Sequence, residues 1–317
     1  MLFAQQFKER QIEWARLAGK GQFLEEKRGW VLKNGFEAEN LFDPRWMRLI
    51  DPRKRHRWFR ALNSSQAFAV NLFGPVASDA KLAASAFSRL FPKRGPLENA
   101  EVKVCLEYTP DDGPLWLGEE NNGQPTQVDV AFLVRLSGKL TGVTLVEVKL
   151  SEPFGMCRGF KHQQKSGVAP SPCNDARSVL ADPQANCWMV SNKSRRYWQV
   201  LKSAKPPLTF DGLPPGAACP FSRGLYQLMR NTALAKALVN RSAADWCDFA
   251  VCSHPSNDSG GEKELAKFRS IFGESAVLSV DPRIVVSAIV ECDKRLSSWA
   301  EYMRKRYGLR DIPNPLQ

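Results

Sequence analysis

The chain has 317 residues, of which 43% are hydrophobic and 25% charged, as is typical of a globular protein with a sizeable core. No apolar run approaches the roughly 18 residues that a transmembrane helix needs, so no such helix is expected. The formal net charge is +12, from 45 Lys and Arg against 33 Asp and Glu, which favours a polyanionic partner.

The first ten residues, MLFAQQFKER, reach charged side chains too early for a secretory signal peptide. We therefore expect a cytoplasmic protein that has no membrane partner. In that compartment the eight cysteines are not expected to form a disulfide framework.

Much of the positive charge falls in three clusters, each with aromatic residues beside it. Basic and aromatic side chains together suit contacts to a nucleic-acid backbone and stacking on bases. Solvated faces of amphipathic helices give the same pattern, so both interpretations stay open. The clusters are Arg53, Lys54, Arg55 and Arg57 with Trp58 and Phe59; Lys193, Arg195 and Arg196 with Tyr197 and Trp198; and Arg304, Lys305 and Arg306 with Tyr302 and Tyr307.

Helices dominate the predicted structure of the first 95 residues. Residues 1–34 contain no turn-forming residue before Gly19, so this peripheral segment is predicted to be helical. Ser64 and Ser65 can cap a helix that Gly74-Pro75 is expected to end. A further helix is predicted from residue 79 to residue 90.

Strands are predicted from about residue 100 onward. Val102, Val104 and Leu106 alternate with polar residues, which is typical of a half-buried strand. Residues 127–134 and 143–150 form two further apolar runs, joined by a short turn. Connections this short imply that the three strands form an antiparallel meander.

The second half of the chain mixes irregular and regular segments. Residues 151–222 are rich in Pro, Gly and Ser and are predicted to be irregular. Later elements are predicted as helices at 224–239, 263–272 and 282–306 and as strands at 248–252 and 276–280. The pattern predicts a mixed α/β fold, with an N-terminal helical region at 1–95, a core at 96–317, and a cysteine-containing insertion at 151–222.

Acidic and basic residues interrupt two of the predicted strands. Side chains two apart on a strand share one face, so Glu147 and Lys149 point together. Asp129 lies on the preceding strand, and pairing of the two strands can bring it beside Glu147. Two carboxylates in such apolar surroundings are costly unless they bind a cation or pair with the lysine. Their oxygens suit Mg²⁺, which would activate a water that Lys149 orients or deprotonates.

A Glu-x-Lys pattern by itself has little specificity, and the chain also contains Glu25-Glu26-Lys27 and Glu101-Val102-Lys103. Glu147 is preferred because its strand is strongly apolar and follows a strand that carries Asp129. A cross-strand salt bridge on a solvated sheet face explains the same residues, and this alternative stays open.

The runs Gln127-Val128-Asp129-Val130 and Leu145-Val146-Glu147-Val148-Lys149 resemble the PD-(D/E)xK nuclease superfamily. Val128-Asp129 stands where the superfamily has Pro-Asp. The closer resemblance is to a bacterial, RecB-like family within it, and three blocks between residues 60 and 240 carry it. These are Ser64-Ser65-Gln66-Ala67 with Asn71-Leu72-Phe73-Gly74; Glu107-Tyr108-Thr109 with the two runs above; and Tyr226-Gln227-Leu228-Met229-Arg230-Asn231.

The resemblance implies a restriction-endonuclease-like core, a mixed sheet with flanking helices, and phosphodiester hydrolysis with one or two metal ions. It implies that Asp129 and Glu147 are metal ligands and that Lys149 is catalytic. Gln227 corresponds to a glutamine that organises the active site of RecB-like nucleases, although ordinary helix-surface hydrogen bonding is an alternative. Glu107 is a further acidic candidate, or else an exposed strand end.

Four cysteines, Cys157, Cys173, Cys187 and Cys219, lie in the predicted insertion. An irregular segment has little core of its own, and a bound metal can hold it together. Four cysteines can bind either a zinc ion or a 4Fe–4S cluster. Some RecB-like nucleases carry such clusters. The wide spacing and the lack of a Cys-x-x-Cys pair argue against either. The other four cysteines have apolar neighbours and are predicted to pack in the core.

The site and the resemblance together predict a Mg²⁺- or Mn²⁺-dependent deoxyribonuclease that acts on single- or double-stranded DNA, in repair or in defence against foreign DNA. No Gly-x-x-x-x-Gly-Lys-Ser/Thr loop occurs, so unwinding would need a helicase or another partner protein. The alternative is a non-catalytic nucleic-acid-binding protein on a nuclease-like scaffold. A basic protein–protein module, the third interpretation, would show no salt-sensitive affinity for nucleic acid.

Overall fold

A computed structural model describes residues 3–94, 99–121, 124–165, 172–204, 207, 210–222, 224–257 and 260–309. Within these ranges, every helix is too short or too polar to cross a lipid bilayer.

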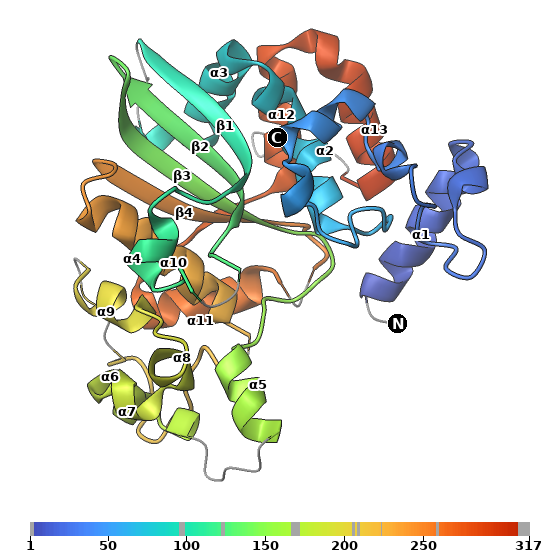
Figure 1. Ribbon diagram of the computed structural model, residues 1–317. Helices are drawn as coiled ribbons and strands as arrows, with labels where there is room; N and C mark the ends of the chain where they lie inside the picture. Colours follow the sequence, from blue (N-terminus) through green and yellow to red (C-terminus); the bar gives the residue numbers. More distant parts are fainter. Residues whose placement is uncertain are drawn as a thin grey trace, which may run out of the picture.

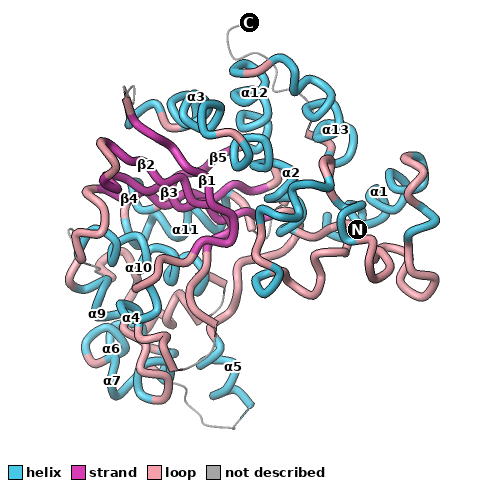
Figure 2. The backbone as a smooth tube through the Cα atoms, turned by 45° about the horizontal axis from the view of Figure 1, so that its top comes forward, coloured by secondary structure: helices cyan, strands magenta, loops and turns pink. Residues whose placement is uncertain are grey.

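A five-stranded mixed sheet lies at the centre of the fold (Figures 1 and 2), with its strands in the order β1-β2-β3-β4-β5. The first three strands pair antiparallel, which confirms the predicted meander. The last two strands add in parallel, next to β3. The strands are β1 (Ala100–Tyr108), β2 (Val128–Leu136), β3 (Lys139–Lys149), β4 (Trp246–Ser253) and β5 (Leu278–Val280).

Helices cover both faces of the sheet, so β3 is buried on both sides and reads as a nearly continuous apolar run. Val146 and Val148 pack into a core formed with α2 (Ser65–Ser78), α3 (Ala80–Leu90), α12 (Pro282–Cys292) and α13 (Ser297–Tyr307). Val143 and Leu145 pack into a second core on the other face, with α10 (Tyr226–Asn240) and α11 (Glu262–Phe272). The mixed α/β fold that the sequence predicts is confirmed.

The prediction that Gly74-Pro75 ends its helix is wrong, because α2 continues to Ser78. A proline inside a helix leaves the carbonyl four residues earlier without its N–H donor. Here that carbonyl belongs to Asn71, and the indole N–H of Trp299 donates to it at 2.7 Å. A residue from α13 therefore compensates for the proline, which no local pattern in the sequence reveals.

Two other helix predictions are too long. At the N-terminus, α1 spans only Phe3–Leu17, and the chain then forms a 3₁₀ turn and isolated bridges, Leu24 to Leu32 and Val31 to Ala61. The C-terminal helix is split into α12 and α13 at Asp293, whose carboxylate accepts the N–H of Arg295 and so caps a new turn.

The segment between β3 and α10 is not simply irregular, because its described residues form five short helices. None is longer than eight residues, and they extend below the sheet layer in Figure 1. They are α5 (Arg158–Lys165), α6 (Ala176–Ala181), α7 (Pro183–Asn186), α8 (Trp188–Ser191) and α9 (Tyr197–Lys202). A single-turn helix, α4 (Gly113–Leu117), lies between β1 and β2.

The division into a helical region at 1–95 and a core at 96–317 stays a prediction. Helices α2 and α3 pack directly against β1, so the two parts share one hydrophobic core in the structure.

His254, which follows β4, is a buried histidine inside this shared core. Its Nε2 lies 2.8 Å from the carbonyl oxygen of Tyr307, and its Nδ1 accepts the N–H of Ser256. The rings of Phe3 and Phe7 pack against the imidazole, with centroids at 5.1 and 5.5 Å. Burial lowers the pKa of His254 to about 4, so the imidazole is neutral in the folded protein at neutral pH.

We expect His254 to make folding sensitive to acid between about pH 6.5 and pH 4. The unfolded chain takes up a proton in this window and the folded chain does not, which costs about 1.4 kcal/mol of stability per pH unit. Above pH 6.5 the imidazole is neutral in both states and has no such effect. The free energy of unfolding by urea at pH 7.5, 5.5 and 4.5 should therefore fall less steeply in His254→Gln than in wild type. Identical slopes in the two proteins would contradict this assignment.

Candidate active site

Three carboxylates stand in a row across three neighbouring strands. Glu107 lies between the pairs Leu106–Val130 and Tyr108–Val128, which places it opposite Asp129. The last pair between β2 and β3 is Val130–Val146, and Asp129 and Glu147 are the next residues on the two strands. Alternation along β2 and β3 directs Asp129 and Glu147 toward the face that α10 covers. Residues far apart in the sequence therefore meet through strand register alone.

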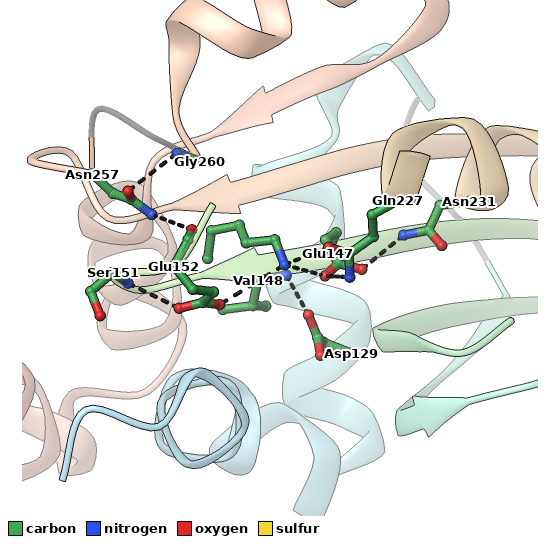
Figure 3. Close-up of polar contacts among 10 residues, drawn as sticks. Asp129, Glu147, Val148, Ser151, Glu152, Gln227, Asn231, Asn257 and Gly260 are labelled. Atoms are coloured by element: carbon green, nitrogen blue, oxygen red, sulfur yellow. Dashed lines mark hydrogen bonds and ion pairs between the residues drawn. The ribbon is translucent and has the colours of Figure 1, made fainter. Parts of the chain in front are cut away.

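Glu147 and Lys149 form an ion pair inside the protein, with Nζ and Oε1 separated by 2.9 Å. Glu147 is 2% exposed and Lys149 is 4% exposed, which rules out a salt bridge on a solvated sheet face. Figure 3 shows Gln227 and Asn231 reaching from α10 toward Glu147. Gln227 donates to Oε1 and accepts from the lysine at 2.7 Å, while Asn231 donates to Oε2 at 2.8 Å.

This arrangement explains how the fold tolerates a buried charge pair. Removing both ions from water is costly unless hydrogen bonds satisfy their remaining polar atoms. Two amide side chains from one helix meet that need, since Gln227 and Asn231 are four residues apart and share a helix face. The sequence pointed to Gln227 as a site residue but Asn231 was missed. Asn231 lies four residues after Gln227 on the same helix, and this spacing could have revealed it.

Asp129 lies at the point where β2 and β3 stop pairing. Its Oδ2 accepts the backbone N–H of Val148 at 2.7 Å, so the side chain replaces a missing ladder partner. The residue is partly exposed, unlike its neighbour Glu147. Asp129 therefore forms an accessible side of an otherwise closed site.

Glu107 sits in left-handed backbone conformation, with φ at 53°. For a residue with a side chain this conformation costs roughly 1–2 kcal/mol, and such strain clusters at functional sites. Gln66 donates to Oε1 of Glu107 at 2.6 Å, and Lys54 donates to its carbonyl oxygen at 2.8 Å. The alternative of an exposed strand end is wrong, because Glu107 is 7% exposed.

Burial and neighbouring negative charges disfavour the ionised forms of Glu107 and Asp129. Burial raises the pKa of Glu107 to about 7, a rise that the hydrogen bond from Gln66 opposes and the charge of Glu147 increases. Burial, Glu147 and Glu107 together raise the pKa of Asp129 well above its ordinary value. Burial lowers the pKa of Lys149, but Glu147, Glu152 and Asp129 outweigh it and hold that pKa above its ordinary value. The site therefore favours an additional cation.

Glu152, just after β3, is a fourth acid that sequence reasoning missed. Its Oε2 accepts the N–H of Ser151, and its Oε1 is 3.9 Å from Nζ of Lys149. This Oε1 is buried and has no hydrogen-bond partner in the described structure. A carboxylate oxygen with free acceptor capacity thus faces the site beside the lysine.

The residues suit a divalent cation by chemistry, although the structure does not arrange them around one. All the donors are carboxylate oxygens, which Mg²⁺ and Mn²⁺ prefer. Within the described ranges, no three His, Cys, Asp or Glu side chains have the geometry of a site for one metal ion. Glu147 is turned toward Lys149 and two amides, so metal binding requires a change in at least one of these contacts.

The four cysteines of the insertion lie together, away from the carboxylates. Cys157, Cys173, Cys187 and Cys219 are buried, form no disulfide bond, and line one small cavity. Burial raises the pKa of Cys157 to about 11. That these cysteines bind a cofactor stays a prediction.

Only part of the predicted basic clusters is available to a ligand. Arg53, Lys54 and Arg57 are exposed, and Lys54 lies beside Glu107. Arg195 and Arg306 are buried and structural: Arg195 donates to the carbonyl of Gly118, and Arg306 donates to carbonyl and side-chain oxygens, that of Asn40 among them. For these two residues, the interpretation as nucleic-acid contacts or solvated helix faces is wrong.

Comparisons with curated proteins and with solved structures gave no match. A family model described as "Restriction Endonuclease associating with ARP" matches residues 25–308, which include every residue of the carboxylate site. A match over this length shows the family, and the chain belongs to these restriction endonucleases, enzymes that cleave DNA.

Proposed function

We propose that this restriction endonuclease is metal-dependent and that Asp129, Glu147 and Lys149 form its catalytic centre. One observation carries the proposal: a buried Glu147–Lys149 pair is fixed by two amides of α10 directly beside a partly exposed aspartate. A purely structural salt bridge does not need two further acids with raised pKa values, Glu107 and Asp129, beside it.

Asp129 and Glu147 are the residues that would hold Mg²⁺ or Mn²⁺, with Glu107 contributing directly or through water. The ion would supply an activated water and neutralise charge that develops on the scissile phosphate. Glu152 is a further acidic group within reach of the lysine.

The protein's own groups orient the reactants. The acidic neighbours keep Lys149 charged, so its ammonium can donate to the attacking water or to a phosphate oxygen. Gln227 contacts both Glu147 and Lys149 and so fixes the distance between them. This dual contact supports the assignment of Gln227 to the glutamine motif of RecB-like nucleases.

DNA would approach on the side where Asp129 and Glu107 reach the edge of the site. Arg53, Lys54 and Arg57 are exposed there on the segment that contacts Glu107 through Lys54. Lys and Arg in such a position bind phosphates by counterion release. Affinity for DNA should therefore fall as salt rises.

The family supports a role in defence against foreign DNA over a role in repair, because restriction is a defence activity. Its description also supports association with the protein or domain that it names ARP, as the partner of this chain.

Asp129→Asn and Lys149→Ala should each lower the cleavage rate by about 100- to 1,000-fold, because each removes a charge that the transition state requires. Asp129→Asn keeps an oxygen acceptor for the N–H of Val148, so the fold should be retained. Cleavage is measured on linear and circular, single- and double-stranded DNA with Mg²⁺, Mn²⁺ or EDTA.

The matched control is Lys103→Ala, which truncates the exposed lysine of the other Glu-x-Lys sequence in the sheet, Glu101-Val102-Lys103. It should cleave at the wild-type rate. Cleavage in EDTA, or cleavage retained by a folded Asp129→Asn protein, would refute the assignment. DNA binding without any cleavage by wild type would instead support the non-catalytic scaffold.

Asn231→Ala should lower the catalytic rate by about 10- to 100-fold, the usual effect of removing a group that orients a metal ligand. Asn231 does not reach the substrate side, so KM for DNA should be unchanged while the half-saturating Mg²⁺ concentration rises. Asn240→Ala, at the exposed end of the same helix, is the control and should behave as wild type. An unchanged Mg²⁺ dependence in Asn231→Ala would show that Asn231 does not position Glu147.

A further inference from the structure

Helix α5 carries a stripe of basic side chains along one face. Four of its residues are spaced i, i+3, i+4 and i+7, which places them on the same side of a helix. They line a groove of about 420 Å³ that has no acidic residue in its lining. The four are Arg158, Lys161, His162 and Lys165, and all of them are exposed.

The opposite face of α5 is packed against the rest of the protein. Phe160 is 4% exposed and lies in the core to which α10 also contributes. Gly159 approaches α8 so closely that a Cβ atom there would lie 3.1 Å from the side chain of Met189 and 3.2 Å from that of Trp188. The basic side chains therefore project from a helix whose position is fixed by packing.

The charge of this stripe is not neutralised within the described residues. Among them, no ion pair includes Arg158, Lys161 or Lys165. Exposed arginines elsewhere behave differently, since Arg45 and Arg295 each pair with an aspartate two residues before them. The stripe is thus a concentrated positive charge that favours an anion from outside the chain.

A second element widens the basic surface. The imidazole of His162 lies against the partly exposed indole of Trp188 on α8, with ring centroids 4.7 Å apart. Nζ of Lys193, which follows α8, lies 5.6 Å from the centre of the same indole. Cations around an aromatic ring suit nucleic acid, because the charges bind phosphates and the ring can contact a base.

The chain connection limits how far α5 lies from the carboxylate site. Eight residues separate Lys149, at the end of β3, from Arg158, at the start of α5, and Figure 1 shows this short connection. Nine steps of fully extended chain span at most about 30 Å. Because a DNA duplex rises about 3.4 Å per base pair, α5 can reach phosphates within roughly nine base pairs of a bond held at Lys149.

We propose that the basic face of α5, with Lys193 beside it, binds the phosphate backbone of DNA to one side of the cleaved bond. DNA is the polyanion that the family cleaves, and α5 directly follows the strand that carries Glu147 and Lys149. This contact is separate from the segment that contains Arg53 and Arg57. Backbone contacts position a duplex without reading its sequence. The binding rests on the charge of α5 itself, and only its place beside the cleaved bond rests on the proposed function.

The test is the triple variant Arg158→Gln/Lys161→Gln/Lys165→Gln, which removes three charges and keeps long side chains that favour a helix. Affinity for labelled DNA duplexes of unrelated sequence is measured in EDTA, which prevents metal-dependent cleavage, over a range of salt concentrations. The slope of log affinity against log salt should become shallower by about 2 to 3, because each neutralised phosphate contributes about 0.9. Affinity at about 0.1 M salt should fall by about 50- to 500-fold for every sequence.

The matched control, Lys81→Gln/Lys103→Gln/Lys294→Gln, removes the same charge from exposed positions on α3, on β1 and after α12. It should keep the wild-type slope. An equal change in the control would overturn the inference, because net charge alone would then explain the effect. If the triple variant does not fold, Lys161→Gln alone should make the slope shallower by about 1.

An unchanged slope in a folded α5 variant would also overturn the inference, and would favour an acidic protein as the partner of this face. Failure of the proposed function gives a different result. In that case the wild-type protein would bind DNA with the same dependence on α5 but would not cleave it in Mg²⁺ or Mn²⁺.

Discussion

The arrangement of the site depends on one buried ion pair, Glu147 with Lys149, at the end of the central strand. Neither charge is stable there alone, so the surrounding structure has to supply polar partners. Strand register brings Asp129 alongside, and α10 brings two amides from the opposite direction. The pair thus joins the antiparallel half of the sheet to the crossover helix that leads into its parallel half.

Helix α10 has two distinct roles because different residues of its first two turns face different neighbours. Gln227 and Asn231 contact the carboxylate site, and Tyr226 and Met229 contact the cysteine cavity. A change in the packing of the insertion would therefore move the groups that orient Glu147. The buried guanidinium of Arg195 extends this link to the β1–β2 connection through Gly118.

Much of this could be predicted from the sequence, because the signals are local. Alternation identified the meander, and strand spacing placed Asp129, Glu147 and Lys149 on one face. What could not be predicted depends on a distant contact: Trp299 donates to the carbonyl of Asn71 and so compensates for Pro75 inside α2. Charge patterns misled at Arg195 and Arg306, whose burial follows from the tertiary fold. The catalytic and cysteine-ligand roles stay predictions.

The central claim is that the carboxylate row binds a divalent cation, and a crystal structure of the protein soaked with Mn²⁺ tests it most directly. Anomalous scattering locates manganese without reference to activity. We expect a Mn²⁺ peak in contact with Asp129 and Glu147, with the side chain of Glu147 or Lys149 shifted from its position in the ion pair. Saturating Mn²⁺ that leaves the Glu147–Lys149 pair unchanged and gives no peak there would contradict the account.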